Sequence, residues 1–195
     1  MARQIDPQKR QAILQAARKI FVRDGYSEAK ISHIATEAGV ASGTVYLYFN
    51  SKEAIAAALA EDFMKRVAEL IREHIPKFGT PAGIEAYIDA VVKIAGDEKD
   101  ALMQVRTDLM KTKGQCSADD RRRLLEVMSG CLESLMDEGK IRRYDPTALG
   151  NLIFGMVHSV VMSCVVFEDL PLLVHRQTAT QVLSQALHIE EATQK

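Results

Sequence analysis

The sequence predicts an all-α protein, with three short helices at the N-terminus and a larger helical bundle after them, about nine helices in all. Apolar residues recur at helical spacing along most of the 195 residues, and no run alternates as a strand would. Asp-Pro pairs at residues 6–7 and 145–146 are strong helix-start signals. Gly25, Gly39 and Gly139 follow apolar stretches, where helices commonly end. The chain is long enough to bury a core of its own.

The first helix begins at Asp6-Pro7, ends at Gly25, and carries one apolar stripe: Ile13, Leu14, Ala17, Ile20 and Phe21. A short second helix spans about 31–38 and stops at Gly39. After a turn, Ser42 is expected to cap a third short helix that runs to about Phe49. A helix, a glycine turn and a second helix in this order have the geometry of a helix-turn-helix.

A long fourth helix is expected to open at Asn50–Glu53, which can form a capping box, and to end near Pro76. Thr80-Pro81 starts a fifth helix with an apolar face through Ala95, and a sixth covers about 98–113. We expect a domain boundary at the start of the fourth helix, with 1–52 as a helix-turn-helix domain and 53–195 as a second, larger domain. Because the junction is a capped helix start, the two domains should be mechanically joined.

The remaining three helices complete the bundle. Ser117 with Asp120 caps a seventh helix, whose apolar stripe keeps helical spacing as far as Gly139. The eighth begins at the second Asp-Pro pair and runs to about Phe167, and the ninth covers about 172–189. No repeat and no low-complexity linker interrupts the series.

The net charge of −1 is unevenly divided along the chain. Residues 1–52 hold eight Lys/Arg and four Asp/Glu, a balance of +4, and the rest holds seventeen and twenty-two, a balance of −5. A basic N-terminal quarter suggests that this end meets a polyanion. The chain opens on polar MARQIDPQKR, and its three cysteines form no C-x-x-C, so we expect reduced thiols, a cytoplasmic protein and no metal site.

The segment 146–167 holds 22 residues without Asp, Glu, Lys or Arg, which is long enough to span a membrane. It also contains several polar residues and lacks the basic and aromatic anchors of a span. Gly155, Ser159 and Ser163 recur every four residues and form a small-residue track that another helix could approach closely. A buried, intersubunit helix is the favoured interpretation, and a membrane span is the alternative.

The aromatic-rich stretch GVASGTVYLYFNSKEAI holds the candidate functional residues. Val45 and Phe49 are four residues apart on one face and should pack inward with Ile34 and Ala35. The second helix of a helix-turn-helix enters the DNA major groove. Small or hydroxyl-bearing side chains on its other faces could then meet DNA.

Here the chain resembles the TetR family of bacterial transcription regulators. The matching run is FVRDGYSEAKISHIATEAGVASGTVYLYFNSKEAI, residues 21–55, with the family pattern of Phe, Gly-Tyr, Ile-Ala-x-x-Ala-Gly-Val and Gly-x-x-Tyr-x-Tyr-Phe-x-x-Lys-Glu. So many fixed spacings make the resemblance specific. Ala29, Lys30 and Ala41 depart from it, since Thr or Ser is usual at these positions.

The resemblance implies which residues meet DNA. Phosphate contacts would come from Thr44, Tyr46 and Lys52, and base edges would be approached by Ser42, Gly43, Leu47 and Tyr48. Lys30 and His33 are either phosphate contacts or part of a solvated face. For Tyr46 the alternative is a partly buried surface tyrosine.

The resemblance also implies a homodimer built from the last two long helices, with two recognition helices about 34 Å apart and a palindromic operator on double-stranded DNA. Interface candidates are Gly155, Ser159, Ser163, Val182 and Ala186. The bundle would hold a small-molecule effector that releases a repressor from DNA, and similarity to fatty-acid-responsive members suggests an acyl-CoA or another amphipathic anion. Candidate ligand contacts are Phe63, Met64, Met103, Arg106, Met110, Met128, Phe154, His158 and Met162, with ordinary core packing as the alternative.

Other functions were weighed against this one. No Gly-rich phosphate loop, H-E-x-x-H or Gly-x-Ser-x-Gly occurs, so catalysis is not expected, and neither is a cofactor. An activator is one alternative, and a ligand-independent or architectural DNA-binding protein is another. Absence of any small molecule that changes DNA affinity would favour the architectural protein.

Overall fold

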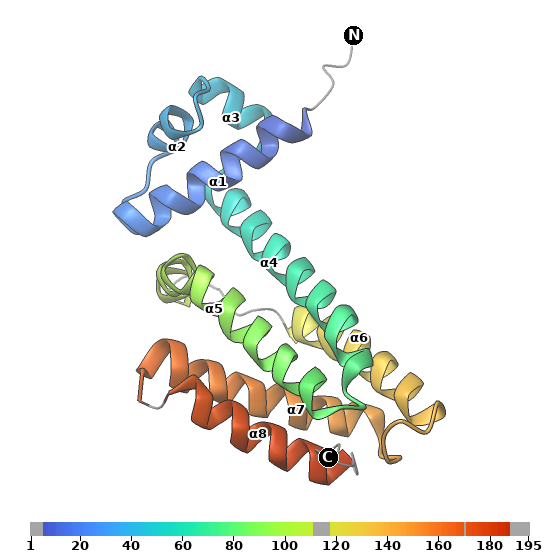
Figure 1. Cartoon of the computed structure of the whole chain (residues 1–195). Coiled ribbons are helices and arrows are strands. Elements are labelled where there is room, and N and C mark those ends of the chain that lie inside the picture. Colours follow the sequence, from blue (N-terminus) through green and yellow to red (C-terminus); the bar gives the residue numbers. More distant parts are fainter. Residues whose placement is uncertain (1–5, 111–117, 170, 188–195) are drawn as a thin grey trace. The chain divides into compact units, whose positions relative to one another are not determined.

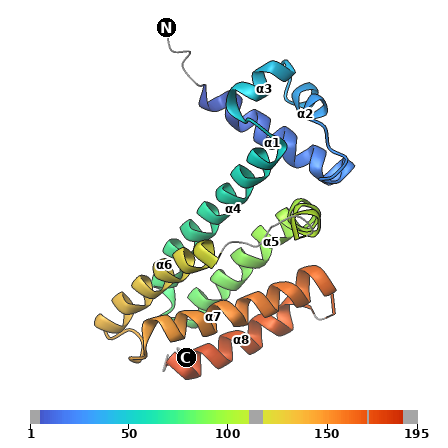
Figure 2. The same cartoon turned by 180° about the vertical axis from the view of Figure 1, so that it is seen from behind.

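The computed structural model describes residues 6–110, 118–169 and 171–187, without the side chains of 98–110 and 118. These residues are helical almost throughout and include no strand, which confirms the predicted all-α class (Figure 1; Figure 2). The elements are α1 (Pro7–Asp24), α2 (Ile31–Glu37), α3 (Ser42–Tyr48), α4 (Lys52–His74), the 3₁₀ turn η1 (Ile75–Lys77), α5 (Pro81–Met110), α6 (Ala118–Asp137), α7 (Pro146–Val161), the π-helical segment η2 (Met162–Phe167) and α8 (Leu172–Leu187).

The described residues form two compact units, and α4 and α5 each contribute to both. The first unit holds the chain up to Phe63 together with the end of α5 from Asp100, and the second holds Met64–Lys99 and the chain from Ala118 onward. The predicted domain boundary between residues 52 and 53 stays a prediction.

The first unit is built on α1, which starts as the sequence predicts. The Asp6 carboxylate accepts a hydrogen bond from the Gln8 amide at 2.9 Å, Pro7 follows, and Gly25 ends the helix. The apolar stripe of α1 enters a core shared with α2, α3 and the first turns of α4. That core holds Ile13, Leu14, Ala16, Ala17, Ile20, Phe21, Tyr26, Ala29, Ile34, Ala35, Val45, Phe49, Ile55 and Ala56.

The turn between α2 and α3 fixes the helix pair. Gly39 has φ of +67°, a conformation that glycine adopts without the steric cost other residues meet. The amides of Gly39 and Val40 bond the carbonyls of Thr36 and Ala35 at 3.1 and 2.9 Å, which closes the end of α2. Val45 and Phe49 are buried, as the sequence predicts.

Two predicted caps are wrong by one residue. Ser42 is the first helical residue of α3 rather than its cap, because Ala41 occupies the N-cap position and makes no side-chain bond. At the start of α4 the cap is Ser51 rather than Asn50, since the Ser51 hydroxyl accepts from the Ala54 amide at 3.2 Å. Asn and Ser both commonly cap helices, so the sequence alone did not decide which of these two neighbours stands at the start of α4.

The prediction of separate fifth and sixth helices is also wrong. α5 runs without a break from Pro81 to Met110, so the described residues hold eight α-helices. The expected break, between Ala95 and residue 98, contains Gly96, but no proline follows this glycine, and a lone glycine in a helix costs only about 1 kcal/mol.

The second unit has its own core, to which α6 and α7 contribute most. It includes the fully buried Phe78, Ile88, Met128, Leu132 and Ile153. α7 begins at the predicted cap, where the Asp145 carboxylate accepts from the Ala148 amide at 2.7 Å. α7 and α8 lie side by side in both views (Figure 1; Figure 2).

α7 passes into π-helix at Met162, which ends the small-residue track. Gly155 and Ser159 are exposed, but Ser163 is only 9% exposed and bonds Asp169 and His175 of its own chain. The prediction that Ser163 belongs to the dimer interface is therefore wrong. Residues four apart on an α-helix point about 40° away from each other around the helix axis, so a track with this spacing winds around the helix. The π-helical turn at Met162 rotates the residues after it further.

By length and composition alone, Pro146–Phe167 could cross a membrane, and it is the one such helix among the described residues. Leu149, Ile153, Val157 and Val160 on this helix are buried in the core of the second unit. One apolar helix that is partly core is weak support for a span.

Candidate nucleic-acid interface

α3 holds two large side chains out of the first unit. Tyr46 is 56% exposed and Leu47 57%, whereas Phe21, Tyr26 and Phe49 of the same unit are buried. Ser42 and Gly43 are exposed beside them, and Thr44 is half-buried. Apart from the neighbouring residues and backbone of α3, no described atom lies within 4 Å of a Cβ built on Gly43, so packing among the described residues does not require a glycine here. This face has the small residues and hydroxyl groups that a close partner needs.

Tyr48 does not belong to that exposed face. It is half-buried against the core, and its hydroxyl accepts a hydrogen bond from the Asp6 amide at 3.2 Å. Within the chain this hydroxyl fastens the start of α1, and the approach of Tyr48 to base edges stays a prediction. Helical spacing puts Tyr48 on the same face of α3 as Thr44, but it does not show that the start of α1 contacts Tyr48.

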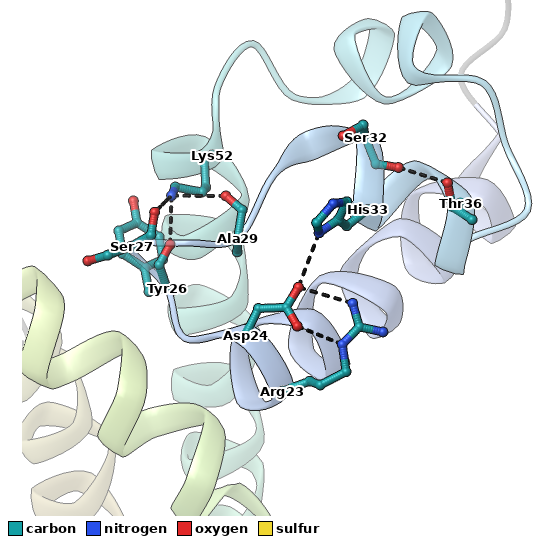
Figure 3. A network of polar contacts seen from close by, with 9 residues as sticks. All are labelled: Arg23, Asp24, Tyr26, Ser27, Ala29, Ser32, His33, Thr36 and Lys52. Carbon is teal, nitrogen blue, oxygen red and sulfur yellow. Dashed lines mark hydrogen bonds and ion pairs between the residues drawn. The ribbon is translucent and has the colours of Figure 1, made fainter.

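Lys52 is engaged inside the unit. Its ammonium lies 2.6, 2.9 and 3.1 Å from the carbonyl oxygens of Tyr26, Ser27 and Ala29 (Figure 3). A lysine has three N–H donors, and three acceptors are in place. The ammonium of Lys52 is therefore held by acceptors within the unit, and its predicted phosphate contact stays a prediction.

His33 belongs to an ion-pair network at the end of α1. Its Nδ1 lies 3.2 Å from the carboxylate of Asp24, which also receives the Arg23 guanidinium at 2.6 and 3.0 Å (Figure 3). The bonds from Arg23, and then from His33, lower the pKa of Asp24 to about 2. The His33 side chain remains 46% exposed. Lys30, at the N-cap position of α2, is exposed.

The predicted ligand residues whose side chains the structure describes differ in burial. Met128 is fully buried, while Phe63, Met64, Phe154 and Met162 are half-buried. The side chains of Met103, Arg106 and Met110 lie outside the described residues.

One further residue, on α7, differs from expectation. His158 is exposed on the same outer face of α7 as Gly155 and Ser159, so the prediction that it sits within the bundle is wrong. Arg121 packs over the Phe154 ring, 5.6 Å from its centroid, and donates to Asn151 at 2.8 Å.

A groove of about 530 Å³ lies elsewhere in the second unit, between the end of α4, η1 and α6. Its residues are Arg72, Pro76, Glu126, Val127, Gly130, Cys131, Ser134, Leu135, Glu138 and Lys140. Burial raises the pKa of the Cys131 thiol, and nearby Arg72 opposes the shift. Sequence reasoning missed this groove because Arg72, Pro76 and Lys140 come to the face of α6 from outside that helix, and no local spacing in the sequence shows this.

A Ser–His pair raises the question of catalysis. Ser163 donates its one proton to Asp169, so the contact of 2.7 Å with His175 requires that the His175 Nε2–H donates to Ser163. A nucleophilic serine needs the opposite direction, with histidine as the acceptor. No group of three or more His, Cys, Asp or Glu gathers as a metal site within the described residues.

An exposed recognition face on a glycine-turned helix pair, in a basic N-terminal segment, defines a helix-turn-helix DNA-binding protein. Residues 13–59 match the family described as "Bacterial regulatory proteins, tetR family". A "Fatty acid metabolism regulator protein" of Bacillus subtilis is 27% identical over 163 residues, 80% of this chain and 84% of that protein. The helix-turn-helix segment of this chain is therefore of the TetR-family kind, and the named relative is a regulator.

Solved structures share the fold at low identity. A putative TetR-family regulator from Mesorhizobium loti has a TM-score of 0.75 at 21% identity, covering 96% of this chain and 98% of that one. FadR from Bacillus subtilis, solved in complex with stearoyl-CoA, has a TM-score of 0.65 at 22% identity, covering 91% of this chain and 99% of that one. These likenesses confirm an N-terminal helix-turn-helix domain followed by a helical C-terminal domain.

Proposed function

We propose that the protein is a homodimeric repressor that inserts α3 into the major groove of a palindromic operator. The observation that carries this proposal is the exposed α3 face of Gly43, Tyr46 and Leu47. Leu47 and Gly43, with Ser42, approach base edges, and Thr44 and Tyr46 donate hydroxyl protons to phosphate oxygens. Lys30, at the N-cap position of α2, and His33 on α2 would contact the phosphate backbone of the DNA.

The partner of this chain is a second copy, bound through α7 and α8. Large apolar side chains are exposed on these helices and the segment between them, namely Leu152, Phe167, Leu173, Val174 and Val182. Gly155, Ser159 and Ala186 are small and exposed and allow close approach. The protein would act in the cytoplasm, on the nucleoid.

The effector is an amphipathic anion of the acyl-CoA class. Support comes from the relative that regulates fatty acid metabolism and from the FadR structure that holds stearoyl-CoA. An effector lowers operator affinity by the amount that it prefers the non-binding conformation, typically 1–3 kcal/mol, or about 5- to 150-fold.

The test is selection of bound duplexes from a random DNA pool by the full chain. One palindrome should be enriched, and Tyr46→Phe and Thr44→Val should each weaken binding by about tenfold, since each removes a hydroxyl bond to a phosphate. Tyr87→Phe, in the core of the second unit, is the matched control and should bind as the wild type does at neutral pH.

Palmitoyl-CoA is then added to the wild-type complex. Release of the duplex supports the effector class, and no change at saturating probe would favour ligand-independent binding. Enrichment of no duplex above background at low salt would contradict the repressor proposal itself. Operator binding that raises transcription from the adjacent promoter would indicate an activator.

A further inference from the structure

The ammonium of Lys52 sits among backbone oxygens of the loop between α1 and α2. Its three partners, the carbonyls of Tyr26, Ser27 and Ala29, lie within four consecutive residues (Figure 3). The Lys52 side chain reaches them from the first position of α4, more than 20 residues further along the chain. The ammonium also lies over the Tyr26 ring, 4.7 Å from its centroid.

A second contact joins the same two segments. The Tyr26 hydroxyl donates to the Glu53 carboxylate at 3.4 Å, next to Lys52 on α4. Hydrogen bonds to Glu53, first from its own amide and then from Ser51, lower the pKa of that carboxyl, so Glu53 is an anion at neutral pH. Tyr26 is itself buried and packs edge-on against Phe21 of α1, 5.2 Å between ring centroids. The Lys52–Glu53 pair therefore holds a loop that is anchored in the core.

The chemistry of this cage selects lysine. A small ammonium can place three donors on three oxygens around one nitrogen, whereas the planar fork of arginine cannot converge in this way. A phosphate, in contrast, accepts either side chain, because both carry one positive charge, and arginine forms the stronger hydrogen bonds to it. Lysine and arginine variants thus separate the two roles.

We propose that Lys52 is a positioning residue that fastens the α1–α2 loop to the first turn of α4, and that it makes no bond to DNA phosphate. Because α2 follows this loop directly and α4 is one helix from Lys52 to His74, the bond couples the recognition helices to α4. A shift of the first turn of α4 would be passed to the loop at this point.

The first test uses the wild-type chain, labelled with ¹⁵N at lysine side chains, in ¹H–¹⁵N correlation NMR. An ammonium held by three carbonyls exchanges its protons slowly, so a Lys52 signal should appear in the DNA-free protein. It should keep its shift when operator duplex is added. A signal that is absent without DNA, and that gains ³¹P coupling with it, would overturn the proposal. The DNA-free arm needs no operator, so it is independent of the repressor function.

The second test compares variants by operator affinity at several salt concentrations. Lys52→Met and Lys52→Arg should both weaken binding by at least tenfold with an unchanged salt slope, because the cage is lost and no phosphate contact is. If Lys52 contacted a phosphate, the slope of log affinity against log salt concentration would be smaller by about 0.9 per protomer in Lys52→Met. Lys52→Arg would then bind the operator as the wild type does. That second pattern would refute the positioning role.

Two other lysine variants serve as controls for the Lys52 variants. Lys30→Met changes the exposed lysine proposed for a phosphate and should lower the slope, and Lys93→Met on α5 should change neither slope nor affinity. Should a Lys52 variant fail to fold, as judged by circular dichroism, the NMR measurement on the wild type still decides.

Discussion

Burial sets the chemistry of single side chains in the second unit, and Tyr87 is the clearest case. It lies in the core, edge-on to Phe78 with ring centroids 5.3 Å apart, and is 3% exposed. Burial raises the pKa of its hydroxyl, because the phenolate would lose its hydration. The folded chain therefore holds this proton more tightly than the unfolded chain does.

The sign of the resulting pH dependence follows from linkage. An unfolded tyrosine ionises near pH 10. Stability from the neutral Tyr87 is thus fully present below that pH and falls as the pH rises above it. We expect Tyr87→Phe to lose less stability than the wild type between pH 9 and 11.

Urea unfolding at a series of pH values measures this difference. The exposed Tyr144, changed to Phe, is the control and should follow the wild-type profile. Parallel profiles for the wild type and Tyr87→Phe would contradict the assignment.

At the scale of elements, the start of α5 depends on one glycine. A Cβ on Gly83 would lie 2.0 Å from the carbonyl oxygen of Lys77 in η1, closer than any non-bonded contact allows. Backbone is in the way rather than a flexible side chain. The tight turn from η1 into α5 therefore requires a residue without a side chain at this position.

Gly83→Ala should destabilise the chain by about 2–3 kcal/mol, since one of the two backbones must move. Gly96→Ala, in the same helix, is its matched control, because none of the described atoms outside the local helix backbone lies within 4 Å of a Cβ there. That change should be neutral or stabilise by up to about 1 kcal/mol, through helix propensity. Chemical denaturation of both variants tests the pair, and equal effects would refute the steric argument.

The sequence predicted elements well where the signal is local. Asp6-Pro7 and Asp145-Pro146 begin helices because cap and proline act within one turn of the chain. The unbroken α5 was missed, since a glycine in a helix and a glycine at its end look alike without the packing around them. The π-helical phase at Ser163 likewise depends on Asp169 and His175, which come later in the chain.

The exposed face of α3 could be predicted because its pattern is local, whereas the contacts that hold α3 and its neighbours in place could not. Spacing on one short helix assigned Val45 and Phe49 to the core. The partners of Lys52 and Tyr48 lie 23 to 42 residues away in sequence, so their roles follow only from the fold. The groove beside Cys131 is non-local in the same way.

At the scale of the whole molecule, the apolar side chains left exposed on α7 and α8 require an explanation. Leu152 is 69% exposed, and exposed Gly155 and Ser159 follow it on α7. Isolated exposed leucines are ordinary, but large exposed apolar patches commonly mark an interface. A symmetric dimer would bring this face against its own copy.

Leu152→Glu should therefore give a monomer, because two carboxylates would be buried against each other across the two-fold axis without a partner charge. Sedimentation equilibrium measures the mass, and operator affinity should fall by at least a hundredfold, since each half-site is then bound singly. Val22→Glu places the same charge on an exposed apolar residue of α1 and should leave the mass unchanged. A Leu152→Glu chain that remains dimeric would show that another surface joins the protomers, and the spacing of the two recognition helices would then have to be set from that surface.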